Sequence, residues 1–234
     1  LFRNIFFSQN QQQLKISNLV KYRRLAENLG PDPILSHFGW RQIFNSNDFS
    51  KLLNNNYFEK INNFDSFNQF NKIYSELQSD DFINKLSYVD IKTWLTNDIL
   101  LKTDRLSMAN GLEIRSPFLN HRIIEKIISI NSRTKINLIN KKILLKKYSK
   151  NILPKKIINK SKSGFNSPIA ESFNNELLEM TKDYFNSNNS KKLFDNKYIF
   201  NLLYRHNSKY EDNHLKLFNI LVILIYFDQY QIIL

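Results

Sequence analysis

The chain has no cysteine, only four glycines and five prolines, and no long apolar run. Without cysteine, these residues can form no disulfide, no thiolate metal site and no cysteine nucleophile. The longest apolar run covers residues 220–227, well short of the roughly 20 residues that cross a bilayer. We expect a buried C-terminal helix there and no membrane partner. The opening LFRNIFFSQN lacks the features of a secretory signal, so a cytoplasmic location is expected.

Common catalytic signatures are absent as well. The sequence has no G-x-S-x-G, H-E-x-x-H, G-x-x-x-x-G-K-[ST] or G-x-G-x-x-G pattern. The four histidines are scattered along the chain: His37, His121, His206 and His214. Isolated histidines are more often ordinary core or surface residues than ligands, and we predict no metal site.

Positive charge is in excess, with a formal net charge of +13. Residues 121–163 hold 13 lysines and arginines and the single acid Glu125, a local excess of 12. Such a field attracts a polyanion, such as nucleic acid, a nucleotide triphosphate or an anionic surface. The alternative, that these lysines are solvated and bind nothing, stays open. Aromatic residues do not interleave with the lysines as in a stacking platform, so nucleic acid is not the expected partner.

Apolar spacing favours helices along nearly the whole chain, and no alternating pattern of a strand is persuasive. The fold class is therefore predicted to be mostly α. One helix is expected to open at residues 80–81, and another to be capped within residues 96–98 and to run to Gly111. Further helices are predicted over residues 14–29, 47–53, 66–77, 122–130, 140–150, 168–185, 191–206 and 212–230. A linker loop is expected within the Asn-rich residues 45–66, and an irregular loop over residues 159–168.

The stretch DILLKTDRLSMANGLEIRSPFLNH, residues 98–121, places charges of both signs at a bend. On a helix, Leu100, Asp104 and Ser107 share one side at spacings of four and three, while Lys102 and Arg105 lie on neighbouring faces.

Beyond this helix, Gly111 suits a left-handed C-cap, and Ser116 favours extended chain because it precedes proline. Alternation then sends Glu113 and Arg115 to one side. Two interpretations stay open: ion pairs that fix the turn, or the wall of an anion or nucleotide pocket.

A second constellation is KSKSGFNSP, residues 160–168. Gly164 lies in a basic loop just before a helix predicted to start at Pro168, where backbone N–H groups and the helix dipole favour an anion. Lys162 would supply a mobile positive charge for a phosphate. Alone, this signal is weak, because basic Gly-Ser loops are common on surfaces.

Together the two stretches resemble the C-terminal part of the glutamine-dependent asparagine synthetase family. The family pattern is close to D-I-L-x-K-x-D-R-x-S-M-A-x-x-L-E-x-R-x-P-F-L-D-H-R, followed by K-x-L-L-R and L-P-x-x-[IL]-x-x-R-P-K-x-G-F-x-x-P-I. This chain matches at Asp98-Ile99-Leu100, Lys102, Asp104-Arg105, Ser107-Met108-Ala109, Leu112-Glu113, Arg115, Pro117-Phe118-Leu119, His121-Arg122, Lys142, Leu153-Pro154, Ile157, Lys162, Gly164-Phe165 and Pro168-Ile169. The likeness continues to the C-terminal helix and, more weakly, back to about residue 15.

The resemblance implies the helical C-terminal portion of an α/β ATP-pyrophosphatase (adenine nucleotide α-hydrolase-like) synthetase domain. Residues 1–78 would be a helical lead-in segment and residues 79–234 the motif-bearing core. Such an enzyme uses ATP and Mg²⁺ to adenylate a carboxylate, typically that of aspartate. Ammonia released from glutamine by an N-terminal glutaminase domain then displaces AMP. A homodimer is compatible with the family.

Carried over by position, Lys162 would be catalytic and would stabilise the phosphorus transition state and pyrophosphate. The residues that would support the ATP and substrate site are Asp104, Arg105, Ser107, Met108, Glu113, Arg115, Lys142, Gly164 and Phe165.

The chain also departs from the family pattern. Asn120 replaces an aspartate, Lys160-Ser161-Lys162 replaces R-P-K, and Phe173 replaces a tryptophan. The S-G-G-x-D-S nucleotide loop, the acidic G-[ED]-G-x-D-E stretch and the glutaminase domain are not among these residues. We therefore expect the isolated chain to be inactive, with most Mg²⁺ ligands upstream. The alternative is a truncated helical module that is not an enzyme and binds polyanions through residues 121–163.

Overall fold

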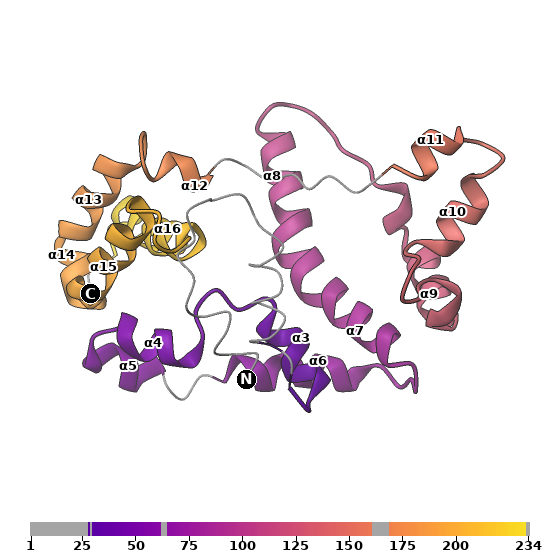
Figure 1. The fold of residues 1–234 in the computed structure, drawn as a ribbon, viewed down its shortest axis with the longest axis horizontal. Coiled ribbons are helices and arrows are strands. Elements are labelled where there is room, and N and C mark those ends of the chain that lie inside the picture. Colours follow the sequence, from indigo (N-terminus) through magenta and orange to yellow (C-terminus); the bar gives the residue numbers. More distant parts are fainter. Residues whose placement is uncertain (1–27, 29, 62–64, 161–168, 233–234) are drawn as a thin grey trace. The chain divides into compact units, whose positions relative to one another are not determined.

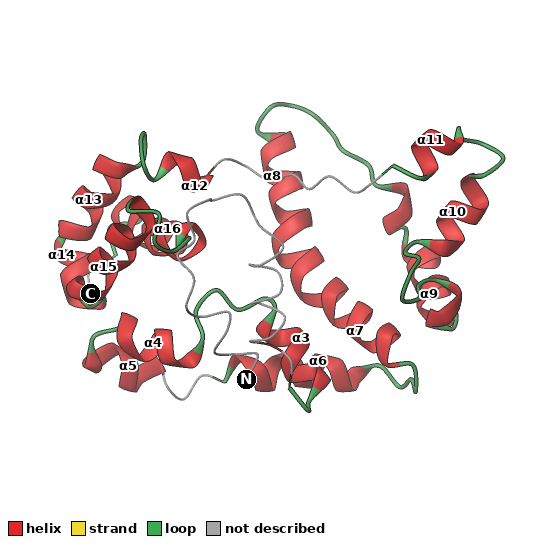
Figure 2. Ribbon diagram, viewed as in Figure 1, coloured by secondary structure: helices red, strands yellow, loops and turns green. Residues whose placement is uncertain are grey.

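The computed structural model describes residue 28 and residues 30–61, 65–160 and 169–232. Within these ranges every regular element is a helix, apart from one isolated β-bridge (Figure 2). The prediction of mostly α structure is confirmed, while the helix predicted over residues 14–29 lies almost wholly outside the described residues. Contacts divide the chain into two compact units: unit 1, residues 1–65 and 165–234, and unit 2, residues 66–164. The subdivision into residues 1–78 and 79–234 follows the sequence motifs and stays a prediction.

Unit 1 combines helices from both ends of the chain. They are α3 (Pro33–Gly39), α4 (Ser46–Leu52), α5 (Asn55–Ile61), α12 (Ile169–Ser172), α13 (Leu178–Asn186), α14 (Asn188–Leu193), α15 (Asn196–Asn207) and α16 (His214–Gln229). The core consists of Leu52, Leu53, Phe173, Phe185, Leu193, Phe194, Ile199, Leu202, Leu203, Leu217, Ile220, Leu221 and Leu224. The α16 helix confirms the predicted C-terminal helix, and one side of it is buried in this core.

Backbone and ionic contacts join the N-terminal helices to the C-terminal ones. Leu53 forms an antiparallel bridge with Phe194. Asp48 on α4 accepts hydrogen bonds from the Tyr198 hydroxyl at 3.0 Å and from Lys216 Nζ at 2.7 Å. Burial, together with the Asp48 carboxylate, raises the pKa of Tyr198. The helix α4 confirms the helix predicted over residues 47–53. The range 45–66, in which a linker loop was expected, also contains α5, and both helices pack side chains against the core.

Two predicted long helices of unit 1 are each divided in two. The stretch 168–185 breaks after α12, where the Asn174 side chain donates to the Ala170 carbonyl and competes with the helical backbone pattern. The stretch 191–206 breaks at Asp195, whose carboxylate accepts from the Tyr198 N–H at 2.7 Å and starts α15 as an N-cap. Apolar periodicity does not predict such breaks, because the helices before and after each break pack against the same core.

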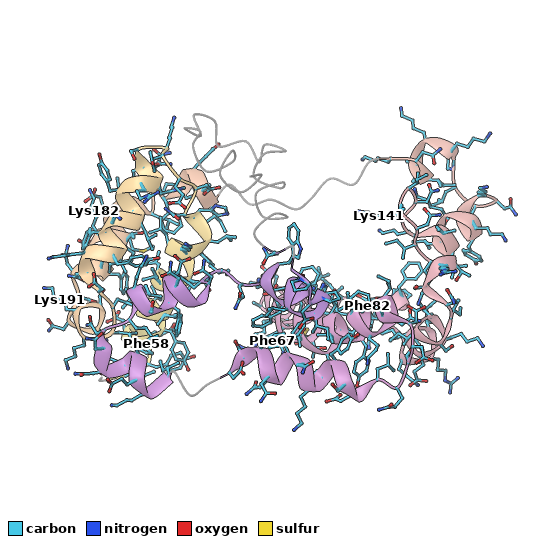
Figure 3. The ribbon with its side chains drawn as sticks, turned by 60° about the horizontal axis from the view of Figure 1, so that its bottom comes forward. Phe58, Phe67, Phe82, Lys141, Lys182 and Lys191 are labelled. Atoms are coloured by element: carbon cyan, nitrogen blue, oxygen red, sulfur yellow. The ribbon has the colours of Figure 1, made fainter. Side chains whose placement is uncertain are left out.

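Unit 2 begins with α6 (Ser66–Glu76), followed by α7 (Phe82–Asp90), the π-helical η1 (Ile91–Leu100) and α8 (Leu101–Met108). The last three form one uninterrupted helical run (Figure 1). On α7, Phe82, labelled in Figure 3, packs against Tyr74 of α6 with ring centroids 6.3 Å apart. The predicted helix start within residues 96–98 is wrong. Thr96 Oγ1 instead donates to the Ile91 carbonyl at 2.7 Å, within the helix.

The rest of unit 2 consists of short helices. They are η2 (Pro117–Leu119), α9 (His121–Ser129), η3 (Ser132–Thr134), α10 (Ile143–Ser149) and α11 (Lys155–Ile158). The helices predicted over residues 122–130 and 140–150 are confirmed, the second with a start at residue 143.

A polar network ties α7 to the turn after α9. Asp81 caps α7 by accepting from the Asn84 N–H at 3.2 Å, and its other oxygen accepts from the Ser132 N–H at 2.6 Å. The buried Asn84 amide donates to the Ile130 carbonyl at 3.0 Å and accepts from Lys135 Nζ. Burial alone would raise the pKa of Asp81, but the hydrogen bonds from Ser132 and Asn84 hold it below the ordinary value. Burial also lowers the pKa of Lys135.

Replacement of Asp81 tests this network. Asp81→Ala should lower the free energy of unfolding by about 1–2 kcal/mol at pH 7, since it removes an N-cap. Because the pKa of Asp81 is depressed in the folded chain, the contribution of its charge is present above the unfolded pKa of about 4 and is lost as pH falls through the folded value. Asp81→Asn, which keeps one acceptor, should cost less. Urea unfolding at pH 7 and pH 3 measures this; an equal deficit at both pH values would contradict the account.

Candidate functional site

The end of α8 is fixed by its backbone. Gly111 has φ +67°, the left-handed conformation that favours glycine. The Leu112 N–H donates to the Ser107 carbonyl at 2.9 Å, and the Gly111 N–H donates to the Met108 carbonyl at 3.0 Å. These two bonds define a Schellman motif, so the predicted left-handed cap is confirmed. The motif ends the long helical run, and an extended segment starts at residue 112.

The charges of the extended segment lie in solvent. Glu113 and Arg115 form an ion pair, as the alternation predicts, with 66% and 85% of their side chains exposed. An ion pair this exposed contributes about 0–1 kcal/mol, and salt screens it. The pair therefore does not fix the turn, which depends on the Schellman motif.

The helical part of the stretch distributes its polar groups differently. Ser107 is buried, and its hydroxyl donates to the Asp104 carbonyl at 3.1 Å, so it acts within the helix. Lys102 pairs with Asp98 one turn earlier. Asp104 and Arg105 are exposed, and in the part of the chain that the structure describes neither has an ion-pair partner. Among the described charges of this stretch, Asp104 and Arg105 are therefore presented singly, and the others form two local ion pairs.

Apolar side chains that neighbour these charged residues in the sequence are also exposed. The helix-end surface, as we define it, consists of Leu106, Met108, Leu112, Ile114 and Phe118, with between 49% and 69% of each residue exposed. Among the described residues of unit 2, the buried apolar side chains are Phe70 and Val89. Apolar side chains left in water at this density are typical of an interaction surface.

Asn120, which replaces the aspartate of the family pattern, has a visible local role. Its side-chain oxygen accepts from the Arg122 N–H at 3.0 Å and caps α9. Asparagine and aspartate are about equally good N-caps, so the start of α9 is kept although the negative charge is lost.

Lys142 occupies a strained position just before α10. Its φ of 57° and ψ of 40° are left-handed, which is uncommon for a residue with a side chain and costs about 1–2 kcal/mol. The Ile143 N–H donates to the Lys135 carbonyl at 2.9 Å and holds the turn. Strained backbone at a residue of the predicted site is consistent with a positional requirement on Lys142.

The segment from residue 133 to residue 160 holds ten cationic side chains and no acidic one. They are Arg133, Lys135, Lys141 (labelled in Figure 3), Lys142, Lys146, Lys147, Lys150, Lys155, Lys156 and Lys160. Within the described ranges, none of them forms an ion pair with a carboxylate. Their uncompensated charge produces the anion-attracting field that the composition predicts.

The central residues of the predicted loop, Lys162, Gly164 and Phe165, lie outside the described residues. In the described ranges, no three His, Asp or Glu side chains are grouped so as to hold a metal ion. None of the helices in these ranges is long and apolar enough to cross a membrane.

The sequence did not reveal two features of the structure, one in each unit. The network of Asp81, Asn84 and Lys135 supports the basic segment, but its partners are about 50 positions apart in the chain. An open polar cavity of about 520 Å³ in unit 1 lies between α4 and α15 and is lined in part by Asn54 and Tyr198. None of the predicted site residues that the structure describes lines this cavity.

Comparison with known proteins places these features in context. The Asparagine synthase family model matches residues 5–229. Asparagine synthetase [glutamine-hydrolyzing] 1 of Bacillus subtilis is 34% identical over 153 residues, which are 65% of this chain and 24% of that protein. A putative asparagine synthetase [glutamine-hydrolyzing] of Mycobacterium bovis is 28% identical over 155 residues, 66% of this chain and 24% of that protein. The chain spans about a quarter of the length of these relatives. No solved structure gives a significant match.

Substitution of Gly111 tests the helix end. No atom lies within 4 Å of a Cβ placed at this residue, so an alanine meets only the backbone strain of φ +67°. Gly111→Ala should lower the free energy of unfolding by about 1–2 kcal/mol, and Gly111→Asn by clearly less, because asparagine tolerates this conformation. Urea unfolding compares the two variants. An alanine variant as stable as the parent chain would rule out the left-handed cap.

Proposed function

The chain belongs to the asparagine synthase family, and we propose that it forms the helical C-terminal part of an ATP-pyrophosphatase-type synthetase domain in a glutamine-dependent asparagine synthetase. The observation that carries the proposal is the helix-end surface, where the motif that resembles the family coincides with exposed apolar side chains and separate charges. A surface of this composition suits contact with the upstream, ATP-binding part of the same domain.

The proposed reaction has two steps. A carboxylate oxygen of the acceptor, typically aspartate, attacks the α-phosphorus of ATP, and the bond to pyrophosphate breaks. Ammonia derived from glutamine then attacks the activated carbonyl carbon, AMP leaves, and loss of a proton gives the amide of asparagine. The first barrier is the negative charge that accumulates on phosphorus and on the departing pyrophosphate.

The basic segment suits the first step. Lys162 follows this uncompensated run of cations directly in sequence and would place its ammonium group against the pyrophosphate oxygens. Lys142 and its neighbours would raise the local positive potential, which favours both entry of ATP and retention of pyrophosphate. Gly164 would allow the backbone to approach the anion closely, and Phe165 would support the loop.

The residues of the helix end would hold this chain against the upstream part of the domain and take no part in the chemistry. Asp104, Arg105 and Met108 would contact the upstream part, where the two charges find partners that the described residues do not provide. Ser107 would hold the last turn of α8, and the Glu113–Arg115 pair would become stronger once water is excluded from it.

The partners follow from this role. They would be ATP, aspartate or another carboxylate, ammonia, and the upstream part with its glutaminase domain. Mg²⁺, held mainly by residues of the upstream part, would neutralise negative charge on the phosphates. A cytoplasmic enzyme, organised as a homodimer, is consistent with the family. The isolated chain should be inactive, because the nucleotide loop is not among its residues.

Exchange of pyrophosphate into ATP in the full-length enzyme tests the role of Lys162. Lys162→Met should lower the carboxylate-dependent exchange rate about 10²–10³-fold, the usual loss when one group that stabilises developing charge is removed. Lys160→Met is the matched control, two residues away, and should keep most of the rate. Glutamine hydrolysis should be unchanged in both variants. A normal exchange rate for Lys162→Met would refute the assignment.

A further inference from the structure

The open polar cavity of unit 1 lies between α4 and α15, two helices that pack side by side within this unit (Figure 1). Its volume of about 520 Å³ falls within the range of roughly 300–1,000 Å³ typical of small-molecule sites. Backbone hydrogen bonds join its two sides. The Asn54 N–H donates to the Leu193 carbonyl at 3.0 Å, and the Asp195 N–H donates at 2.8 Å to the carbonyl of Leu52. The backbone on both sides of the cavity is therefore held in a fixed register.

Three of the lining side chains can offer a ligand only hydrogen-bond acceptors. Asn54 donates both amide hydrogens to backbone carbonyls of α14, at 2.9 and 2.8 Å, so only its oxygen is left. Tyr198 donates its hydroxyl proton to Asp48 at 3.0 Å. Burial, and after it the Asp48 carboxylate, raises the pKa of this hydroxyl, which therefore stays protonated and offers a lone pair. Asp195 adds a carboxylate, one oxygen of which caps α15. These groups suit a ligand that donates, such as an ammonium group.

Two positive charges line the same cavity. Lys51 and Lys197 are both exposed, and within the described ranges neither of them forms an ion pair. Their ammonium groups can only donate hydrogen bonds, so they suit a ligand that accepts. With the carboxylate of Asp195, the cavity holds two positive charges against one negative charge, a net charge of +1.

This mixture of charges disfavours ligands of a single sign. A metal cation would meet two ammonium groups, while a simple anion such as phosphate would meet the Asp195 carboxylate and acceptors that it cannot satisfy. A ligand with one ammonium group and two carboxylates complements all three charges. An acidic amino acid has this charge pattern on a small frame.

We propose that this cavity binds an acidic amino acid, aspartate or glutamate. The ammonium group of the ligand donates to the Asp195 carboxylate and to the Asn54 oxygen. Its two carboxylates accept from Lys51 and Lys197. Because the ligand contacts residues from both sides of the cavity, its binding stabilises the attachment of α4 to α15. The site lies wholly within unit 1, and the inference does not rest on the proposed function.

Calorimetric titration of the 234-residue chain with L-aspartate at low salt tests the site. The expected dissociation constant is on the order of 1 mM, because an open cavity leaves much of the ligand hydrated. Succinate has the same two carboxylates and no ammonium group, and it should bind at least about tenfold more weakly. Asparagine has one carboxylate and should bind about threefold more weakly. Succinate binding as tight as aspartate binding, or no aspartate binding at about 10 mM, would overturn the inference.

Asp195→Asn separates the effect of charge from that of structure. Asparagine is about as good an N-cap as aspartate, so α15 should keep its start. Loss of the negative charge should weaken aspartate binding about tenfold and strengthen succinate binding, because a repulsion is removed. Asp183→Asn, which removes an exposed acid of α13 outside the cavity, is the matched control and should change neither. Weaker binding of both ligands to Asp195→Asn would indicate lost structure and overturn the inference.

Lysine variants test the other side of the ligand and keep the test valid if Asp195→Asn does not fold. Lys51→Met and Lys197→Met should each weaken aspartate binding by up to about fivefold, and the difference should fade at high salt. Lys191→Met is the control, since this exposed residue of α14, labelled in Figure 3, does not line the cavity. Equal weakening in all three variants would show that only the net charge of the chain matters and would overturn the assignment of the site.

Discussion

The left-handed turn at Gly111 is the constraint on which the candidate site depends. It stops the helical run that starts at Phe82 and sends the chain into the extended segment that ends at Ser116, just before η2. Every residue of the helix-end surface lies on the last turns of α8 or in the short stretch that this turn orients. The backbone bonds of the Schellman motif do this without help from the exposed Glu113–Arg115 pair. The exposed charged side chains at the helix end are consequently available to contact a partner.

The two units differ in what holds them together. Unit 1 has a core of Leu, Ile and Phe side chains contributed by both ends of the chain. Unit 2 buries few apolar residues in its described part and relies on the polar network of Asp81, Asn84 and Lys135 to attach the basic segment to α7. A unit with a small core and a large exposed apolar surface is what a part of a larger domain requires. This difference is the physical basis for our proposal that unit 2 contacts the upstream part of the domain.

Local backbone structure could be predicted from the sequence, whereas contacts between residues far apart in the chain could not. Gly111, the Ser116–Pro117 step and the C-terminal helix follow from the conformational limits of single residues and from apolar spacing. The expected helix start near Thr96 was wrong because a threonine hydroxyl can bond backwards within a helix as well as cap one. The anchors at Asp81 and Asp48 could not be predicted, because each joins residues that are more than 50 positions apart and neither has a sequence pattern.

Amide hydrogen exchange over residues 112–118 tests the central claim most directly, namely that the helix-end surface contacts the upstream part of the synthetase domain. In the described part of the chain, the backbone N–H groups of residues 113–116 donate to no protein acceptor, so they should exchange rapidly in the isolated chain. In the full-length enzyme, a covering partner should slow their exchange at least about tenfold. Equally fast exchange in both proteins would show that this surface stays in solvent and would contradict the account.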